Sequence, residues 1–435
     1  MLVIILCQVQ VRAANSPCGY HDLTSNLINQ TSQASWAGWI ERLSGETSVE
    51  IGGQLNQVIL TRYSPAMFGG YPNSRGFQYV LEQVRNWYPD SQIEIDPYHP
   101  YPSTNPDVTW YNLVVTIPGS VFPQEEVLLT AHLDSIVTGY GENPHLYAPG
   151  AEDNASGSAA LLEAARIFRY YQFNRTIRFI WFTGEEQGLL GSKAFVMDHP
   201  VEKIVGVINL DMFGYDSDND GCFELHVGNL PASQTVGQCF DQSISDFAPG
   251  LKRKFITSVM DRSDHAPFWS KGIGAVEVLE NYGGYYTISS NTCTIQEDRN
   301  PSYHRYTDTI TNLNLTSGFE IVKASLAALS GLAEPLGLRG PVLSVKSNAS
   351  GTTLSWVLVP GASRYHVNRS ERGCSSGMEY YAETTSTEYL DTPPPSSSFY
   401  FYTIEALDGN GFVFAPLSNC APLPFSITLP WIHRE

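Results

Sequence analysis

The chain has 435 residues, which at about 100–200 residues per domain predicts two or three folded units. Hydrophobic residues make up 42% of the sequence and charged residues 16%, a composition that favours packed cores and excludes a largely disordered chain. The 44 acidic residues outnumber the 25 basic ones and give a net charge of −19, which disfavours binding to nucleic acid. No run of about 20 apolar residues follows the N-terminus, so we expect no membrane-spanning helix.

Residues 1–14 resemble the end of a secretion signal. An apolar run from Met1 to Cys7 precedes the tripeptide 11–13, which has the small-x-small pattern that is typical of signal cleavage. The basic residues that normally begin such a signal do not occur here, so we expect a start that is either truncated or mis-called. We therefore expect a secreted protein, and a buried N-terminal strand is the alternative.

Seven cysteines occur, and removal of Cys7 with the signal leaves an even set, which in an exported chain is compatible with disulfides. We prefer pairs whose members lie in one expected domain. This reasoning predicts Cys222–Cys239 and Cys374–Cys420, and by elimination Cys18–Cys293.

Residues 15–110 are a polar stretch with one clear helix, in which the apolar side chains between Phe77 and Val84 lie on one face. Residues 111–338 alternate apolar strands with helices. Because the strands are continuous runs of Val, Ile, Leu and Phe, they indicate a sheet buried on both faces, and therefore an α/β sandwich. We expect strands at 111–117, 127–131, 177–182, 205–210 and 275–279, and helices at 157–170, 188–196, 232–244, 266–270 and 318–332.

The pattern changes near residue 341. Short strands separated by Gly, Pro and Ser predict an all-β sandwich over residues 341–424, followed by a tail at 425–435. Trp356, with Tyr400 or Tyr402 ahead of a glycine-rich turn, resembles the core tryptophan and corner tyrosine of a fibronectin type III domain. This stretch contains no catalytic motif, and the fold alone assigns it no function.

Polar residues follow three of the expected strands. In an α/β sheet, groups at the carboxyl ends of strands lie where ligands bind, although each such residue alone is more often a cap or a turn residue. Two adjacent carboxylates in that place repel each other unless a cation or a proton relieves them. The residues are His132 and Asp134 after the second strand, Glu185 and Glu186 after the third, and Asp211 after the fourth.

Two further candidates lie in loops. Asp153 is in the loop 150–157 at the start of an expected helix, and His304 is in the polar loop 303–308. If they join the strand-end residues, two histidines and three carboxylates form a nitrogen and oxygen ligand set. Such a set suits zinc or a similar divalent ion, and one carboxylate can bridge two ions.

Five segments carry a family resemblance, namely 131–135, 150–157, 182–192, 209–212 and 303–309. In this order they resemble the secreted di-zinc aminopeptidases that include the bacterial leucyl and Streptomyces-type enzymes. The five together are far more specific than any one of them. The resemblance implies a catalytic domain of the zinc exopeptidase type over residues 111–338, with a mixed central sheet between helices. Residues 15–110 are then either its N-terminal segment or a pro-segment.

The resemblance also implies a set of metal ligands for two zinc ions. Asp153 matches the carboxylate that bridges the two ions. Glu186 and His304 would share one zinc, and His132 and Asp211 the other. The peptide bond after the bridging aspartate is typically cis in this family.

Further roles come from the same resemblance. Glu185 matches the general base and Asp134 the carboxylate that orients a metal-bound histidine. In the implied reaction two zinc ions acidify a bridging water, and Glu185 accepts its proton and passes it to the leaving amine. A tyrosine hydroxyl commonly assists the oxyanion in this family, and the candidates are Tyr282, Tyr285 and Tyr286.

The loop 216–221 contains alternate aspartates and ends in glycine, like the start of an EF-hand loop. Val227 stands where that loop needs a bidentate glutamate, so a solvated acidic loop is favoured over a calcium site. Because members of the family sometimes bind calcium, a looser Ca²⁺ site remains the alternative.

We therefore expect a secreted zinc aminopeptidase that acts on peptides with a free N-terminus and has no nucleic-acid or membrane partner. A carboxypeptidase of the same fold would need a basic pocket, for which Arg262, Arg299 or Arg305 is available. A glutaminyl cyclase would use one zinc ion, and a receptor-like ectodomain would normally have lost ligands that are all present here. The sequence leaves open the preferred N-terminal residue, the oligomeric state and the choice between zinc and other divalent ions.

Overall fold

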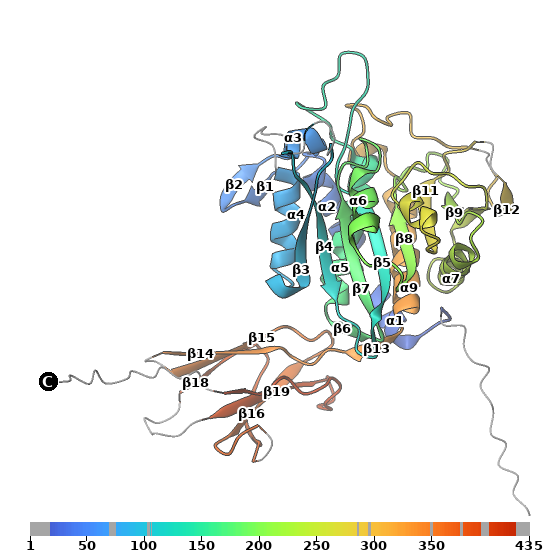
Figure 1. The fold of residues 1–435 in the computed structure, drawn as a ribbon. Helices are drawn as coiled ribbons and strands as arrows, with labels where there is room; N and C mark the ends of the chain where they lie inside the picture. Colours follow the sequence, from blue (N-terminus) through green and yellow to red (C-terminus); the bar gives the residue numbers. More distant parts are fainter. Residues whose placement is uncertain are drawn as a thin grey trace, which may run out of the picture. The chain divides into compact units, whose positions relative to one another are not determined.

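The computed structural model describes residues 18–68, 75–101, 105, 107–284, 287–294, 297–348, 351–374, 377–392 and 400–422. The chain divides into two compact units, one of residues 1–169 and 173–336 and one of residues 170–172 and 337–435 (Figure 1). The expected signal at 1–14, the tail at 425–435, Tyr285 and Tyr286 lie outside the described residues. Of the helices in the described ranges, none has the length and apolar character needed to span a bilayer.

The helices of the first unit are α1 (Asp22–Ile28), α2 (Gln33–Leu43), α3 (Ser64–Phe68), α4 (Arg75–Arg85), α5 (Ser156–Phe168), α6 (Leu190–Asp198), α7 (Pro231–Phe247), α8 (Ala266–Ser270) and α9 (Leu315–Ala333). Its strands are β1 (Val49–Ile51), β2 (Gln54–Gln57), β3 (Ile93–Tyr98), β4 (Trp110–Ile117), β5 (Phe122–His132), β7 (Arg175–Phe182), β8 (Ile204–Leu210), β9 (Cys222–His226), β10 (Lys252–Ile256), β11 (Ala275–Glu280) and β12 (Ile288–Asn291). Short strands β6 (Tyr171–Phe173) and β13 (Pro335–Leu338) lie at the boundary between the units in the sequence. Every strand and helix that the sequence predicts for residues 111–338 is present, with ends that differ by a few residues.

The main sheet has nine strands in the order β12-β10-β9-β11-β8-β5-β7-β4-β3. Strand β5 runs parallel to β7 and β8, and β8 runs parallel to β11. The carboxyl ends of these four strands therefore meet at one edge. Because β9 is antiparallel to β11 and β4 is antiparallel to β7, the sheet is mixed, as expected.

Helices cover both faces of this sheet (Figure 1). On one face, Leu128 and Ile180 pack against Phe195 of α6 and Phe268 of α8. Helices α5 and α9 contact β5 and β7 on the other face, and α7 packs beside α9. Burial on both faces explains the continuous apolar runs of the central strands, and the predicted α/β sandwich is confirmed.

Residues 18–101 belong to this same unit and contain more regular structure than the sequence predicts. The predicted helix is α4, while α1, α2 and α3 lack a strong apolar period. Trp36 of α2 is fully buried, and its Nε1 donates to the carbonyl of Ser156 at 3.0 Å. The segment thus supplies part of the core around α5.

The disulfides correct part of the sequence prediction. The predicted Cys374–Cys420 bond is confirmed, whereas Cys222–Cys239 and Cys18–Cys293 are wrong. Preference for pairs within one domain could not separate the remaining four cysteines, because all four lie in the first unit. The Cys18–Cys239 bond ties the start of the described chain to α7. The Cys222–Cys293 bond joins the first residue of β9 to the segment that follows β12. The third bond is Cys374–Cys420.

The second unit is all-β. Its strands are β14 (Leu343–Asn348), β15 (Gly351–Trp356), β16 (Arg364–Ser370), β17 (Glu379–Thr384), β18 (Glu388–Asp391), β19 (Phe401–Leu407) and β20 (Ala421–Pro422), in sheets β14-β15-β18 and β17-β16-β19-β20. Trp356 and Tyr365, from different sheets, pack into one core with Tyr402. The Tyr402 hydroxyl donates to the side chain of Asp391 at 2.8 Å rather than to a backbone carbonyl. The fibronectin type III resemblance therefore stays a prediction.

Candidate metal centre and substrate pocket

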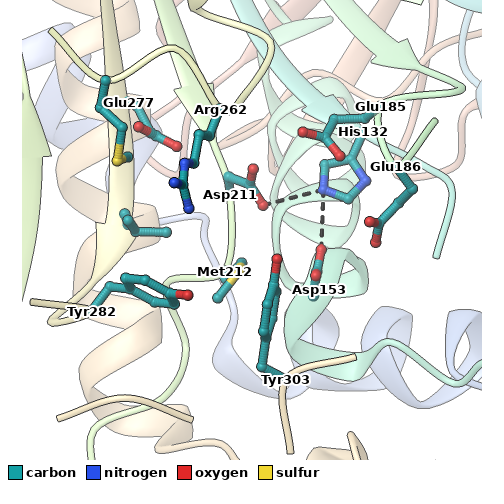
Figure 2. A pocket seen from close by; sticks show the side chains of 12 residues that line it. His132, Asp153, Glu185, Glu186, Asp211, Met212, Arg262, Glu277, Tyr282 and Tyr303 are labelled. Carbon is teal, nitrogen blue, oxygen red and sulfur yellow. Dashed lines mark hydrogen bonds and ion pairs between the residues drawn. The ribbon is translucent and has the colours of Figure 1, made fainter. Parts of the chain in front are cut away.

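A pocket of about 520 Å³, its open mouth included, lies at the edge where β5, β7, β8 and β11 end. Twelve side chains line it, among them His132, Asp153, Glu185, Glu186 and Asp211 (Figure 2). The parallel topology therefore brings the strand-end residues together, as the sequence predicted.

Asp153 lies between two histidines. Its Oδ1 is 3.1 Å from His132 Nε2, and its Oδ2 is 3.0 Å from His304 Nε2. His132 Nε2 is also 3.2 Å from Asp211 Oδ1, and His304 Nε2 is 3.0 Å from Glu186 Oε2. The five predicted ligands thus form two groups of three that share Asp153.

The donor chemistry of these groups fits divalent cations. In each group one imidazole and two carboxylates place their ligand atoms within 4.8 Å of one another. Three protein ligands of this kind leave a coordination position open, as in catalytic zinc sites. Glu186 Oε1 is buried and has no hydrogen-bond partner among the described residues, so a cation would satisfy an oxygen that is otherwise unpaired.

A backbone contact sets the tautomer of His132. Its Nδ1 is 3.0 Å from the carbonyl oxygen of Asp134, which can only accept a hydrogen bond. Nδ1 therefore carries a proton, so Nε2 is the ring atom that would bind a cation held between Asp153 and Asp211. The Asp134 carboxylate accepts the backbone N–H groups of Glu185 and Glu186 at 3.3 and 3.4 Å, so one residue positions both strand ends.

The cluster retains protons when only protein groups balance its charge. Burial and the charge of Asp153 raise the pKa of Glu186 to about 8. Burial opposes ionisation of His304, but hydrogen bonds to Asp153 and Glu186 raise its pKa to about 10. Divalent cations would compete with these protons, because metal ligands must be deprotonated.

Glu185 lies beside His132 but outside the two groups that share Asp153. It lines the pocket, and its ligand oxygen is close enough to His132 and Glu186 to form a third group. Burial raises the pKa of Glu185 well above its ordinary value, and the charge of His132 opposes this effect. A raised pKa suits a carboxylate that accepts and releases a proton near neutral pH.

The Asp153 loop is fixed from two sides. Asp153 belongs to the turn Ala151–Ala155, and its peptide bond to Asn154 is cis, as expected. The Asp308 carboxylate accepts the N–H groups of Glu152 and Asp153 at 3.1 and 3.2 Å. The Asn154 side chain donates to the carbonyl of Leu210 at 2.8 Å, which ties the turn to the end of β8.

Arg62 holds the loops beneath the metal centre. Its fully buried guanidinium donates at 2.6–2.8 Å to the carbonyls of Leu43, Leu133, Pro149 and Gly150. Leu133 lies between two site residues, and Pro149 and Gly150 directly precede the Asp153 turn. Burial lowers the pKa of Arg62 to about 10, so it remains charged at neutral pH. Sequence reasoning missed this residue, because no motif surrounds it.

We expect Arg62→Met to lower the free energy of unfolding of the first unit by about 3–5 kcal/mol, because several buried carbonyls lose their donor at once. Chemical denaturation in the presence of a chelator measures this without a contribution from bound metal. Arg85→Met is the matched control, since Arg85 is exposed and makes only a surface ion pair with Asp90 at 3.4 Å. A change below about 1 kcal/mol in Arg62→Met would show that other groups or water satisfy these carbonyls.

Comparison with known protein families matches residues 112–329, half of the chain, to Peptidase family M28. The chain belongs to peptidase family M28. Leupeptin-inactivating enzyme 1 of Streptomyces exfoliatus is 32% identical over 229 residues, which are 49% of this chain and 46% of that protein. A probable leucine aminopeptidase of Trichophyton verrucosum is 30% identical over 237 residues, 51% of this chain and 57% of that protein. This M28 chain spans about half the length of the curated relatives that it matches.

Solved structures show the same fold at low identity. The LapA aminopeptidase of Legionella pneumophila aligns with a TM-score of 0.55 and 19% identity, covering 77% of each chain. A glutaminyl cyclase of Porphyromonas gingivalis aligns with a TM-score of 0.50 and 15% identity, covering 69% of this chain and 98% of that one. The zinc exopeptidase type of fold is therefore confirmed for this M28 peptidase.

Tyr303 is a pocket residue that the sequence analysis missed. Its ring stacks on that of His304 with 3.8 Å between centroids, and Figure 2 shows its hydroxyl directed toward the space between Asp153 and Asp211. Burial, and then the charge of Asp153, raises the pKa of Tyr303 well above its ordinary value, so the hydroxyl keeps its proton. Of the predicted tyrosines, Tyr282 also lines the pocket. The feature of the sequence that could have indicated Tyr303 is its position directly before His304, a metal-ligand candidate.

The acidic loop brings Asp216 and Asp218 to within ligand distance of Asp298. Asp216 Oδ2 already accepts hydrogen bonds from Ser317 Oγ at 2.6 Å and from the N–H of Gly221 at 3.2 Å. These hydrogen bonds can hold the conformation of the loop without a cation. Calcium binding stays a prediction.

Proposed function

We propose that this M28 peptidase is a secreted, zinc-dependent aminopeptidase that removes the N-terminal residue from peptides. The observation that carries the proposal is the pair of ligand groups in which each oxygen of Asp153 faces a different histidine. A carboxylate shared in this way is suited to bridge two ions. The family and its aminopeptidase relatives supply the reaction class.

In this proposal each of two zinc ions has its own group of ligands. His132, Asp153 and Asp211 would hold one ion, and Asp153, Glu186 and His304 the other. Bound zinc supplies a Lewis acid for the scissile carbonyl and lowers the pKa of a water molecule at the site.

The residues of the chain perform the proton transfers. Glu185 accepts the proton of the attacking water and donates it to the leaving amine, and its raised pKa favours both steps. Asp134 fixes the backbone of Glu185 through its carboxylate, so the base keeps its position. The protonated hydroxyl of Tyr303 donates a hydrogen bond to the oxyanion that develops on the substrate carbonyl.

The test is hydrolysis of aminoacyl p-nitroanilides by the full chain. We expect activity that a chelator abolishes and zinc restores, with two zinc ions per chain by elemental analysis. N-acetylated peptides should not be cleaved, because a free α-amino group is expected to bind near the acidic cluster. Cleavage of only the blocked peptides would support a carboxypeptidase instead. One zinc ion per chain would favour a glutaminyl cyclase.

A further inference from the structure

Besides the metal-ligand candidates, several apolar side chains line the same pocket. Met212, Met260, Leu279 and Tyr282 line it together with Glu277. In Figure 2, Glu277 lies on the opposite side of Asp211 from His132 and Glu186. If the proposed function holds, a substrate whose α-amino group and carbonyl meet the metal centre would extend its N-terminal side chain into this space.

Glu277 is a carboxylic residue among the apolar side chains that line the pocket. It lies on β11, between β8 and β9, and is only 2% exposed. Its Oε2 is buried and accepts no hydrogen bond from the described residues. A buried carboxylate of this kind is costly unless a partner satisfies it.

The neighbouring basic groups do not serve as that partner. His265 Nδ1 is 3.6 Å from Glu277 Oε2, but His265 Nε2 donates to the carbonyl of Met260 at 2.8 Å. Burial lowers the pKa of His265 to about 3, so Nδ1 is a lone pair and not a donor. Lys254 is 3.5 Å from Glu224 on the adjacent strands.

Arg262 lines the same pocket but is exposed, and no ion pair joins it to Glu277 among the described residues. Arg262 is open to solvent, whereas Glu277 is buried. The buried group that lacks a partner is therefore the Glu277 carboxyl. Burial raises its pKa well above the ordinary value, and a cation bound beside it would favour its ionised form.

We propose that Glu277 binds the ammonium or guanidinium group of the substrate's N-terminal side chain, so that the enzyme prefers peptides that begin with lysine or arginine. The aliphatic part of such a side chain would contact Met212, Met260 and Leu279, and its charged end would reach the carboxylate. A leucine side chain would fill the apolar part and leave the carboxylate unpaired. This inference rests on the proposed aminopeptidase function and adds the substrate class.

The experiment compares lysine p-nitroanilide with norleucine p-nitroanilide, which has the same straight carbon chain without the charge. We expect kcat/KM of the zinc-loaded enzyme to favour lysine by about 10-fold or more, the lower end of what a close charge pair contributes. Glu277→Gln keeps the shape of the side chain and should bring the ratio close to one. Glu277→Leu should raise the activity on norleucine and lower it on lysine.

Asp261→Asn is the matched control. Asp261 is an exposed carboxylate next to Arg262 and does not line the pocket, so its loss should leave the lysine preference unchanged. Zinc content and circular dichroism show whether each variant is folded and loaded. Calorimetry with free L-lysine and L-norleucine, the expected products, gives a binding ratio that does not depend on turnover.

Equal activity on the two anilides in the wild-type chain, or an unchanged ratio in Glu277→Gln, would overturn the specificity proposal alone. If the enzyme instead prefers a glutamate anilide and loses this preference in Arg262→Gln, the specificity proposal is overturned, and Arg262 rather than Glu277 selects the substrate side chain. If no anilide is cleaved by the zinc-loaded chain, the proposed function fails, and the calorimetric ratio still decides whether Glu277 selects a basic side chain.

Discussion

Glu185→Gln is expected to lower kcat by about 10²–10⁴-fold while two zinc ions remain bound. Glutamine has nearly the same shape, and its backbone N–H can still donate to Asp134 as that of Glu185 does at 3.3 Å. The amide cannot accept the proton of the attacking water or return it to the leaving amine. Steady-state hydrolysis of an aminoacyl anilide and elemental analysis of the same sample measure the two quantities.

Glu202→Gln is the control for the loss of one negative charge, because Glu202 is exposed and precedes β8, whose other end leads to Asp211. Its kcat should equal that of the wild-type chain. If Glu185→Gln retains kcat within about tenfold, less than general-base catalysis typically contributes, another group must accept the proton.

Asp153→Asn is expected to remove zinc from both sites and to lower activity by about 10³-fold or more, since Lewis-acid stabilisation of several kcal/mol is lost. Asp153 is the carboxylate that both ligand groups share. An asparagine side chain carries no charge and would present its NH₂ group to one of the two histidines. Elemental analysis after dialysis against a limiting chelator gives the zinc content.

Asp211→Asn provides the comparison, because Asp211 belongs to only one of the two groups that share Asp153. We expect this variant to keep one zinc ion and to lose less affinity overall. Retention of two ions by Asp153→Asn, or equal loss in both variants, would contradict the shared role of Asp153.

The strand-end residues could be predicted from the sequence because parallel strands give a simple rule. The strands β5, β7 and β8 are parallel, so their carboxyl ends lie at one edge of the sheet. The polar residues at these ends, His132, Glu186 and Asp211, therefore meet there. Asp153 and His304 lie in loops, whose positions depend on contacts far away in the sequence. Only the similarity of whole segments to a known family placed them in the site.

Other features had no local signal. Arg62 makes its hydrogen bonds to carbonyls, which every residue has, so its partners leave no pattern in the side chains. The Cys18–Cys239 bond depends on the packing of the N-terminal helices against α9, which lies beside α7, and short apolar motifs do not specify this packing. Glu277 stands between apolar residues of β11, and the role of its side chain depends on which face of the strand meets the pocket.

The hydrogen bonds of Arg62 also bear on how far this protein can be shortened. A fragment trimmed to the family match at residues 112–329 would keep all five ligand candidates but would lack the guanidinium that supports Leu133, Pro149 and Gly150. It would also lack Trp36, which packs at the start of α5. Recombinant work on the catalytic unit should therefore retain the residues from Cys18 onward, since they scaffold the very loops that present the ligands.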